Sequence, residues 1–312
     1  MMIKKGKPKL SIVVLNYNTC DLLFDCLSSL KKVKDEADFE VIVVDNASKD
    51  KSISMVQKEF PEVVLVKNDK NLGFAAGNNR AKDKVRGEYV LFLNSDTVVY
   101  PNAIKETVKY LGGNREVGAI SCKLVLPNGE LDKDTRRSFI TPWIGLIHLV
   151  LKLDRVFPKS TIFGKYWYGY ISEDEIHEVD ALQGAFFMTR KKILDDVGWF
   201  DEDYFLDGED IDLSWRIKEK GWKLIYYPKV KTLHLKGVSK GKLISDKRRR
   251  VNLGEKVKIR IQGVKSMEIF YRKRLWQKYP IFVNYLVLVG IKLVLLTRIV
   301  RTFFEWVIFD LI

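Results

Sequence analysis

One short segment combines residue types that can hold a divalent metal ion. Asn94-Ser95-Asp96 directly follows an apolar run. A carboxylate at such a point can bind Mg²⁺ or Mn²⁺, which prefer oxygen ligands and leave coordination positions open for phosphate. An Asp after a strand is also a common turn residue, so the motif alone permits either interpretation.

A denser acidic cluster lies further along the chain. Its four carboxylates fall within six residues, immediately before a helical stretch, and they are Asp207, Glu209, Asp210 and Asp212. Acidic residues in a first helical turn complement the helix dipole, which is one explanation. Carboxylates this close together also raise one another's pKa or bind a cation. A carboxylate with a tuned pKa is what a general base needs to take a proton from a hydroxyl.

Two further segments are open to a structural or a functional interpretation. His234 follows a strand in the apolar context Thr232–Leu235, where a histidine is either a packed side chain or a metal ligand. The segment 73–79 carries two glycines but not the spacing of a dinucleotide fingerprint. We expect its glycines to let backbone approach a nucleotide, with Asn78 and Asn79 offering polar contacts at a helix start.

The elements that must position these residues alternate along the first hundred residues. Apolar β-branched runs predict strands at 10–15, 40–44, 63–66 and 89–93, with helices at 21–30, after 48–50 and at 75–85. Strands without polar alternation indicate a parallel sheet covered on both faces, that is, a doubly wound α/β domain. Ligands bind such sheets at the carboxyl ends of the strands, and polar residues follow all four strands: Asn16 and Asn18, Asp45 and Asn46, Asn68 and Asn71, and Asn94 to Asp96.

The rest of the chain predicts a second part of this domain and an appendage. Residues 127–129 predict a turn, and the aromatic-rich stretch 139–170 predicts a long, mobile, irregular loop. Ordered structure is expected again at 179–189, as helices after 191 and at 211–220, and as a strand at 223–227. We expect a catalytic domain at 8–240 and a helical C-terminal region at 241–312.

The charge of the chain is concentrated near its C-terminus. Of the net +14, residues 236–278 contribute most, with 15 Lys and Arg against three acidic residues. Such a segment favours a polyanionic surface, but no nucleic-acid-binding module accompanies the run 247–250, so we expect no nucleic-acid partner. The three cysteines are too scattered for a disulfide framework or a metal knuckle and predict reduced thiols.

The last helix predicts contact with a membrane. Residues 281–297 are strongly apolar, but Asn284 and Lys292 interrupt them. Polar residues at 298, 301, 302 and 305 share one helical face, which favours an amphipathic helix in the interface of an anionic membrane. A helix packed on the protein and a spanning helix are the alternatives. The expected location is cytoplasmic, peripheral on the inner face of the cell membrane.

The ordered motifs resemble a known enzyme family. The chain is similar, over about residues 9–239, to the inverting family-2 glycosyltransferases of the GT-A nucleotide-diphospho-sugar transferase fold, and most to their rhamnosyltransferase-like branch. The motifs that carry the resemblance are SIVVLNYN, VIVVDNASKD, NLGFAAGNN, VLFLNSD, GAFFMTRK, GWFDEDYFLDGEDIDLSWR and HLKG.

The resemblance implies roles for individual residues. Asn16, Asp45 and Asn78 match positions that contact the nucleotide, and Asn94-Ser95-Asp96 occupies the family's DxD position. Asp96 would hold the Mg²⁺ or Mn²⁺ that bridges the diphosphate, with His234 as a further ligand. Asn94 replaces the first acid of that motif, a departure shared with the rhamnosyltransferase-like members. Glu209 and Asp210 match the ED motif, with Asp210 the expected catalytic base. Gly184 and Ala185 would line the sugar pocket, and Trp199 the acceptor side.

The activity implied is transfer of a sugar, with rhamnose the leading expectation, from a nucleoside-diphosphate donor with inversion at the anomeric carbon. The acceptor would be a saccharide or a lipid-linked saccharide used in cell-surface polysaccharide assembly. Two alternatives share the broad fold, a sugar-phosphate nucleotidyltransferase and a non-catalytic nucleotide-sugar-binding scaffold. The first is expected to carry a glycine-rich N-terminal signature that residues 10–18 lack, and the intact acidic motifs disfavour the second.

Overall fold

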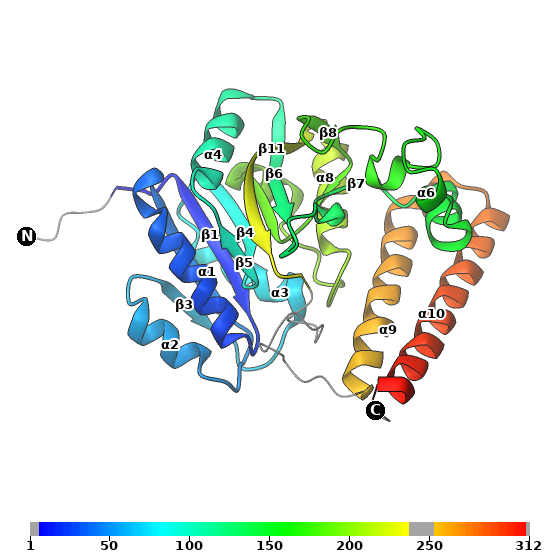
Figure 1. Cartoon of the computed structure of the whole chain (residues 1–312). Coiled ribbons are helices and arrows are strands. Elements are labelled where there is room, and N and C mark those ends of the chain that lie inside the picture. The colour runs from blue at the N-terminus through cyan, green and yellow to red at the C-terminus, as the bar shows by residue number, and fades with distance from the viewer. Residues whose placement is uncertain (1–5, 237–252, 310–312) are drawn as a thin grey trace, which may run out of the picture.

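The structure is a computed structural model that describes residues 6–236 and 253–309. A mostly parallel sheet forms its centre, with helices on both faces and a pair of long C-terminal helices beside it (Figure 1). The strand order is β3-β2-β1-β4-β10-β6-β11-β5, and β8 pairs with β11. This is the α/β architecture that the sequence predicts, with helices at its C-terminal end.

The first half of the sheet is parallel, as the sequence predicts. It comprises β1 (Leu10–Asn16), β2 (Phe39–Asp45), β3 (Val64–Lys67) and β4 (Tyr89–Asn94). The register pairs Asn16 with Asp45 and Leu15 with Asn94, so the polar strand ends come to one edge of the sheet. The sequence expectation of a shared polar edge is therefore confirmed.

Successive side chains of the parallel strands enter two separate cores, because a strand alternates its faces. Ile12 and Val14 pack with helices α1 (Cys20–Lys32), α2 (Ser52–Glu59) and α4 (Ala103–Gly113). Val13 packs on the opposite face with α3 (Gly73–Asn79), α7 (Lys191–Val197) and α8 (Glu209–Glu219). All side chains of β1 up to Val14 are buried, which explains why the strand has no polar alternation.

The second half of the sheet is mixed. It contains β5 (Thr97–Val99), β6 (Val117–Val125), β8 (His177–Val179), β10 (Phe186–Arg190) and β11 (Lys223–His234); β10 runs antiparallel to both β4 and β6. The strand predicted at 223–227 continues to His234 through a register shift between Tyr227 and Lys231. Pro228 lies at this irregularity, where the missing N–H of proline costs no ladder bond. His234 is therefore the last residue of a strand.

The helix predicted at 75–85 is shorter and begins earlier. The Asn71 side chain accepts a hydrogen bond from the Gly73 amide at the start of α3. At the end, Asn79 exchanges two hydrogen bonds with the Phe200 backbone, and a short 3₁₀ turn, Lys82–Lys84, follows. Asn78 and Asn79 therefore lie in the last turn of the helix and not at its start, which corrects the sequence interpretation.

The stretch 139–170 is more ordered than predicted. It contains α5 (Pro142–Gly145), a π-helical turn (Leu146–Leu151), α6 (Leu153–Val156) and a 3₁₀ turn (Lys165–Trp167). Gly164 and Gly169 both lie against the Pro158 carbonyl, at which an added Cβ would stand 2.0 Å and 2.1 Å from the oxygen. Only glycine permits backbone to approach this closely, so these positions close the loop on itself.

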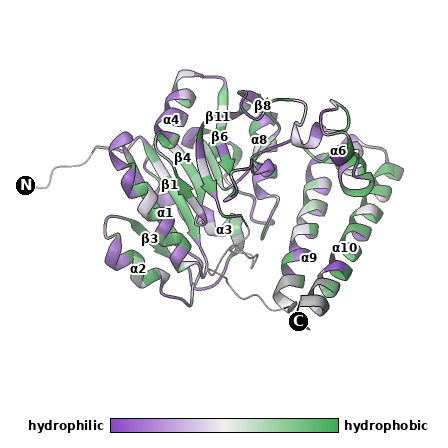
Figure 2. Cartoon of the chain, in the orientation of Figure 1, coloured by the Kyte–Doolittle hydropathy of each residue, from purple (hydrophilic) through white to green (hydrophobic). Residues whose placement is uncertain are grey.

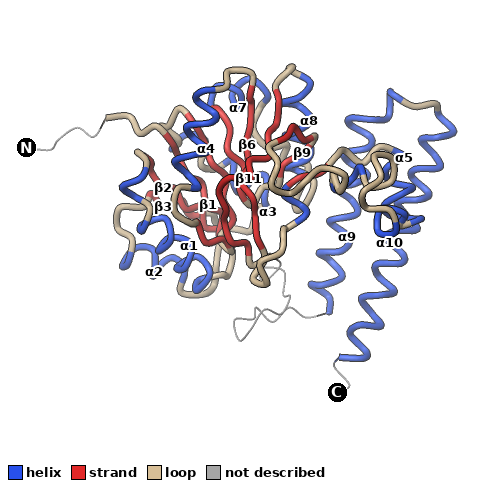
Figure 3. Tube along the Cα trace, turned by 45° about the horizontal axis from the view of Figure 1, so that its top comes forward, coloured by secondary structure: helices blue, strands red, loops and turns tan. Residues whose placement is uncertain are grey.

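The C-terminal helices α9 (Leu253–Phe270) and α10 (Ile281–Phe309) run side by side (Figure 3). Val264, Phe270 and Ile291 pack with Tyr204 and Trp215 of the catalytic unit in a third apolar cluster. One face of α10 is thus covered, whereas Leu286, Leu293 and other apolar side chains remain exposed. Figure 2 shows hydrophobic residues along the length of this helix. The helix is long and apolar enough to cross a membrane by length and composition.

Candidate active site

The ends of β1 and β2 form a buried, fully bonded polar cluster. Asn16 donates from its side chain to Asp45 Oδ2 at 2.8 Å and to the Ser48 hydroxyl at 3.1 Å. Asp45 Oδ1 accepts from the Ser48 amide at 2.8 Å, and Thr19 donates to Asn16 Oδ1 at 2.6 Å. Asp45 is 1% exposed and Asn16 is fully buried, so the two side chains fix the shape of this edge.

Amide side chains join the ends of β2 and β3 to the start of α3. Asn46 donates to the Gly73 carbonyl at 2.9 Å and accepts from the Asn68 side chain at 2.8 Å. Gly73 has φ +81°, and an added Cβ would lie 2.3 Å from the Phe205 carbonyl oxygen. The glycine is required here because an L side chain would meet both backbone strain and this contact.

The turn Asn94-Ser95-Asp96 is tied to its surroundings on both sides. The Asn94 amide donates to the Ala185 carbonyl at 3.2 Å, and Ser95 Oγ lies 3.0 Å from Thr19 Oγ1. Asp96 is 3% exposed, and its carboxylate Oδ1 faces His234 Nε2 at 3.4 Å. The structure therefore brings together two residues that are 138 positions apart in the sequence.

His234 is held between two carboxylates. Its Nδ1 lies 2.8 Å from Asp132 Oδ2, and Asp132 in turn bonds the Lys236 ammonium. Burial lowers the pKa of His234, but the bonds and charges of Asp132 and Asp96 outweigh this effect and raise it to about 9. Burial raises the pKa of Asp132, but the bonds and charges of His234 and Lys236 outweigh this effect and hold it well below its usual range.

This arrangement suits a divalent ion. A carboxylate and an imidazole nitrogen 3.4 Å apart can both reach an ion that each binds at about 2.0–2.2 Å. Asp132 on the far ring nitrogen is the outer carboxylate that typically orients a metal-binding histidine. Within residues 6–236 and 253–309, no group of three or more His, Cys, Asp or Glu is placed to hold an ion by itself.

The acidic residues at 207–212 bond different partners. Asp210 Oδ2 accepts from Arg137 at 2.8 Å and from the Gly184 amide at 3.0 Å, and the residue is 7% exposed. Burial lowers the pKa of the Arg137 guanidinium, yet the neighbouring Asp210 charge raises it above the ordinary value. Glu209 precedes Asp210, at the first position of α8, and is also buried.

Asp212, the fourth acid of this cluster, binds to the C-terminal region. It is fully buried and accepts from Arg216 Nε and Arg274 Nε, each at 2.7 Å, with the Tyr204 hydroxyl at 3.3 Å. Two arginines therefore neutralise this carboxylate. Asp212 connects α8 to the turn that joins α9 and α10.

Hydrogen bonds connect the Asn94–Asp96 turn, His234 and Asp210 through two short segments, 184–185 and 132–137. Gly184 bonds Asp210 and the next residue, Ala185, bonds Asn94, which places the two acidic motifs side by side. On the other side, Asp132 bonds His234 and Arg137 bonds Asp210 from one short segment, 132–137. A donor-diphosphate metal site at Asp96 and a base at Asp210 would thus share one frame.

A family model matches the part of the chain that contains most of the sheet. The model for glycosyl transferase family 2 matches residues 11–198, more than half of the chain. The chain belongs to glycosyl transferase family 2.

Two curated relatives of this glycosyltransferase are an O-antigen biosynthesis protein and a rhamnosyltransferase. It is 28% identical over 241 residues to the O-antigen biosynthesis protein RfbC of Myxococcus xanthus, covering 76% of the chain but 18% of that protein. It is 27% identical over 246 residues to the N-acetylglucosaminyl-diphospho-decaprenol L-rhamnosyltransferase of Mycobacterium tuberculosis, covering 75% of the chain and 78% of the relative.

A solved structure shares the fold. The mannosyltransferase from Pyrobaculum calidifontis, in complex with GDP-Man and Mn²⁺, superposes with a TM-score of 0.56 at 19% identity. The match covers 86% of this glycosyltransferase and 64% of that chain. The expected family and fold are therefore confirmed.

Three residues assigned to the site of the glycosyltransferase lie inside it rather than at its surface. Trp199 is 1% exposed, packs edge-on against Phe92 at 6.0 Å and donates its indole N–H to Asp195, so it does not form the acceptor side. Asn78 is 1% exposed and donates to the Phe74 carbonyl of its own helix. The Ala185 side chain packs in the core, and only its carbonyl contacts a motif.

Two residues of this frame were not predicted. Asp132 and Arg137 belong to no motif of the sequence, and the turn at 127–129 gave the only local signal near them. That turn is confirmed by the hydrogen bond from the Gly129 amide to the Leu126 carbonyl. Their partners are 102 and 73 residues away, a separation that no local pattern can encode.

Proposed function

We propose that this glycosyltransferase transfers rhamnose from a nucleoside-diphosphate donor to a saccharide or lipid-linked saccharide, with inversion, in cell-surface polysaccharide synthesis. The observation that carries the enzymatic part is the set of hydrogen bonds that places Asp96 and His234 beside Asp210. The 27% identity to a diphospho-decaprenol rhamnosyltransferase over most of both chains supports the sugar and the lipid-linked acceptor.

Asp210 is the proposed base. Arg137 bonds its Oδ2 at 2.8 Å, and in this role the Asp210 carboxylate would accept the proton of the attacking hydroxyl. The Gly184 amide and Arg137 both hold Oδ2, which fixes the direction in which the carboxylate faces. Glu209 is the neighbouring acid of the same motif, and Gly184 would contact the donor sugar.

Asp96 and His234 are the proposed ligands of Mg²⁺ or Mn²⁺. Because these two residues supply one oxygen and one nitrogen, the donor diphosphate and water would complete the coordination, which is usual for Mg²⁺. A bound ion would neutralise charge on the departing nucleoside diphosphate. The proposed nucleotide site is formed by Asn16, Asp45, Asn78 and Asn94. The buried residues Asn16, Asp45 and Asn78 would support the residues that touch the donor.

The test of this function is a donor screen. Thermal unfolding with a panel of nucleoside-diphosphate sugars, with and without Mn²⁺, should show stabilisation by a rhamnose donor. Transfer of radiolabelled sugar to a diphospho-lipid N-acetylglucosamine acceptor should follow, and Asp96→Ala should abolish it. Stabilisation by other donors alone would overturn the rhamnose assignment, and pyrophosphorolysis of the donor would favour a nucleotidyltransferase.

We propose that residues 8–240 form the catalytic domain and residues 241–312 a C-terminal region. This region would bind the inner face of the cell membrane. The proposed boundary and the basic run 247–250 lie outside the described residues. Exposed apolar side chains follow one face of α10, and they are Phe282, Tyr285, Leu286, Val289, Leu293, Leu296, Val300 and Phe303. Thr302, from the predicted polar face, is buried, so the outward face of the helix is more apolar than the sequence suggested.

Flotation with anionic liposomes tests this placement. The full chain should float, and glutamate at Leu286, Leu293 and Val300 together should keep it at the bottom of the gradient. These positions are exposed, so the fold tolerates the change. Flotation that is unaltered by the triple variant would contradict the proposal.

A further inference from the structure

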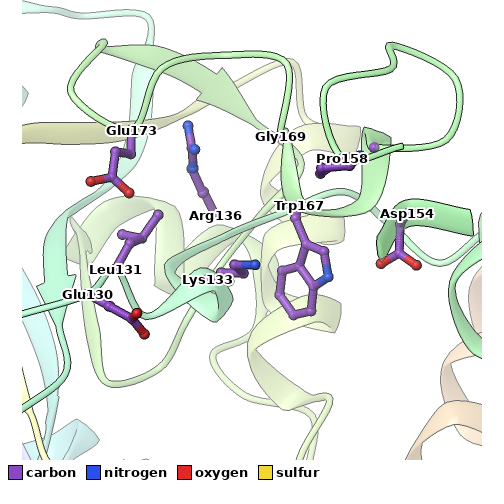
Figure 4. Close-up of a pocket in the computed structure, with 10 residues that line it drawn as sticks. Glu130, Leu131, Lys133, Arg136, Asp154, Pro158, Trp167, Gly169 and Glu173 are labelled. Carbon is purple, nitrogen blue, oxygen red and sulfur yellow. The ribbon is translucent and has the colours of Figure 1, made fainter. Parts of the chain in front are cut away.

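A cavity lies outside the frame that joins Asp96 to Asp210. Its volume is about 360 Å³, and a second cavity of about 370 Å³ adjoins it, with Lys133, Asp154, Pro158 and Trp167 lining both. Volumes of this size fall within the range of small-ligand sites. Figure 4 shows Trp167 between Lys133 and Asp154, with Arg136 above them.

Two buried polar atoms in the lining lack a partner. Asp154 is 4% exposed; its Oδ2 lies 2.7 Å from His148 Nδ1, whereas its Oδ1 has no hydrogen-bond partner among the described residues. Arg136 is 5% exposed and donates to the carbonyls of Ile171 and Ser172, yet its Nε has no partner in that same part of the chain. Buried polar atoms in a folded protein are rarely left unbonded, so a carboxylate acceptor and a guanidinium donor are set for a ligand.

Trp167 supplies the apolar surface of the cavity and is held in place. It is half-buried and packs edge-on against His148 at 5.4 Å and Tyr166 at 4.5 Å. The Tyr166 carbonyl accepts from the Ser138 amide, which anchors the turn that carries the indole. The indole is therefore held in the same lining as Asp154 and Arg136.

The chain itself connects this cavity to the reaction centre. In the strand β7 (Arg136–Arg137) neighbouring side chains point to opposite faces, so Arg137 reaches Asp210 while Arg136 enters the cavity. Lys133 likewise lines the cavity next to Asp132, the partner of His234. One segment of six residues thus forms a wall shared by the cavity and the reaction centre.

We propose that this cavity binds a saccharide unit of the acceptor at some distance from the reacting hydroxyl, an inference that rests on the proposed function. A sugar ring offers an apolar C–H face for the indole, and hydroxyls that donate to Asp154 Oδ1 and accept from Arg136 Nε and Lys133. Glu173 of the lining is neutralised by Lys123 at 2.8 Å, so the cavity has donors and acceptors of both signs, which suits a neutral polyol.

Saturation-transfer NMR on the full chain without donor tests this site directly. The probes are disaccharides that contain rhamnose, N-acetylglucosamine, glucose or galactose. At least one should receive saturation through its ring protons, and Trp167→Ala should weaken its affinity by at least about tenfold. Trp167→Phe keeps an aromatic face and should restore most of the binding.

Trp143→Ala is the matched control, since Trp143 is 55% exposed on the same stretch and does not line the cavity. It should bind the disaccharides as the wild type does. No saturation with any probe, or equal loss in Trp143→Ala and Trp167→Ala, would overturn the site. Because these measurements need no donor, their failure is separable from failure of the sugar-transfer proposal, which the donor screen measures.

Discussion

The two halves of the site are built from different chemistry. The half at β1, β2 and α3 is bonded mainly by amide side chains. Asn46 bonds the Asn68 side chain and the Gly73 carbonyl, and Asn16 bonds the carboxylate of Asp45. The half at β11 and α8 uses buried carboxylates that have basic partners. Asp132 has Lys236 and His234, and Asp210 has Arg137.

This difference indicates a structural role for the amide half and a catalytic role for the charged half. An amide network is itself neutral, so it makes the edge rigid without adding charge to that of Asp45. Paired charges can instead accept a proton or an ion, at a desolvation cost that the partner offsets. We therefore expect substitutions in the charged half to change turnover, and those in the amide half to change stability and donor affinity.

The largest expected effect is that of Asp210→Asn. The amide keeps the shape of the side chain but cannot take a proton, so kcat should fall by about 10²–10⁴-fold. Donor binding, measured by thermal stabilisation, should be nearly unchanged. Asp203→Asn, at an exposed acid that pairs with Lys273, is the control. Normal turnover by Asp210→Asn would remove it from the role of base.

Asp132→Asn should weaken metal binding and leave proton transfer to Asp210 unchanged. The amide oxygen can still accept from His234 Nδ1, but the charge that orients the imidazole is lost. The Mn²⁺ concentration for half-maximal activity should rise about 10–100-fold. Asp134→Asn is closely matched, because Asp134 also bonds Lys236, at 2.6 Å, but does not contact His234. Equal metal requirements in the two variants would contradict a second-layer role for Asp132.

The two halves also differ in how far the sequence predicted them. Asn16, Asp45 and Asn94 each end a strand of a parallel sheet, so strand length and register alone bring them to one edge. That is local information, which apolar runs carry. The partners Arg137 and Asp132 depend on a turn and a two-residue strand, whose placement follows from tertiary packing.

Burial was the weaker part of the prediction. Trp199 belongs to the core because Phe92 and Asp195 satisfy its ring and its N–H, and neither contact is visible in a motif. Asn78 lies in the last turn of α3, which spans Gly73–Asn79, and there its side chain bonds the Phe74 carbonyl. The sequence indicates which residues are polar, and packing decides which of them face the ligand.

Asn46→Ala tests the amide half. Asn46 is 2% exposed, and its loss leaves the Gly73 carbonyl and the Asn68 side chain without their partner. Unfolding in denaturant should show a loss of about 1–3 kcal/mol in the free energy of unfolding, with kcat at saturating donor little changed. Asn128→Ala, at an exposed turn, should change stability by less than about 0.5 kcal/mol. A large fall in kcat with unaltered stability would reverse the proposed division between the halves.

The smallest expected effect belongs to Gly184→Ala, at the position where the halves meet. An added Cβ would lie 3.1 Å from the end of the Phe74 ring and 3.8 Å from Asp210 Cβ. The ring must give by a few tenths of an ångström, so the donor KM should rise a few-fold while the base keeps its geometry. Gly113→Ala, where the space around the Cβ is open, should leave both constants unchanged. If Gly184→Ala lowered kcat as much as Asp210→Asn does, the two halves would be one mechanical unit, because a methyl group that touches Phe74 would then displace the base.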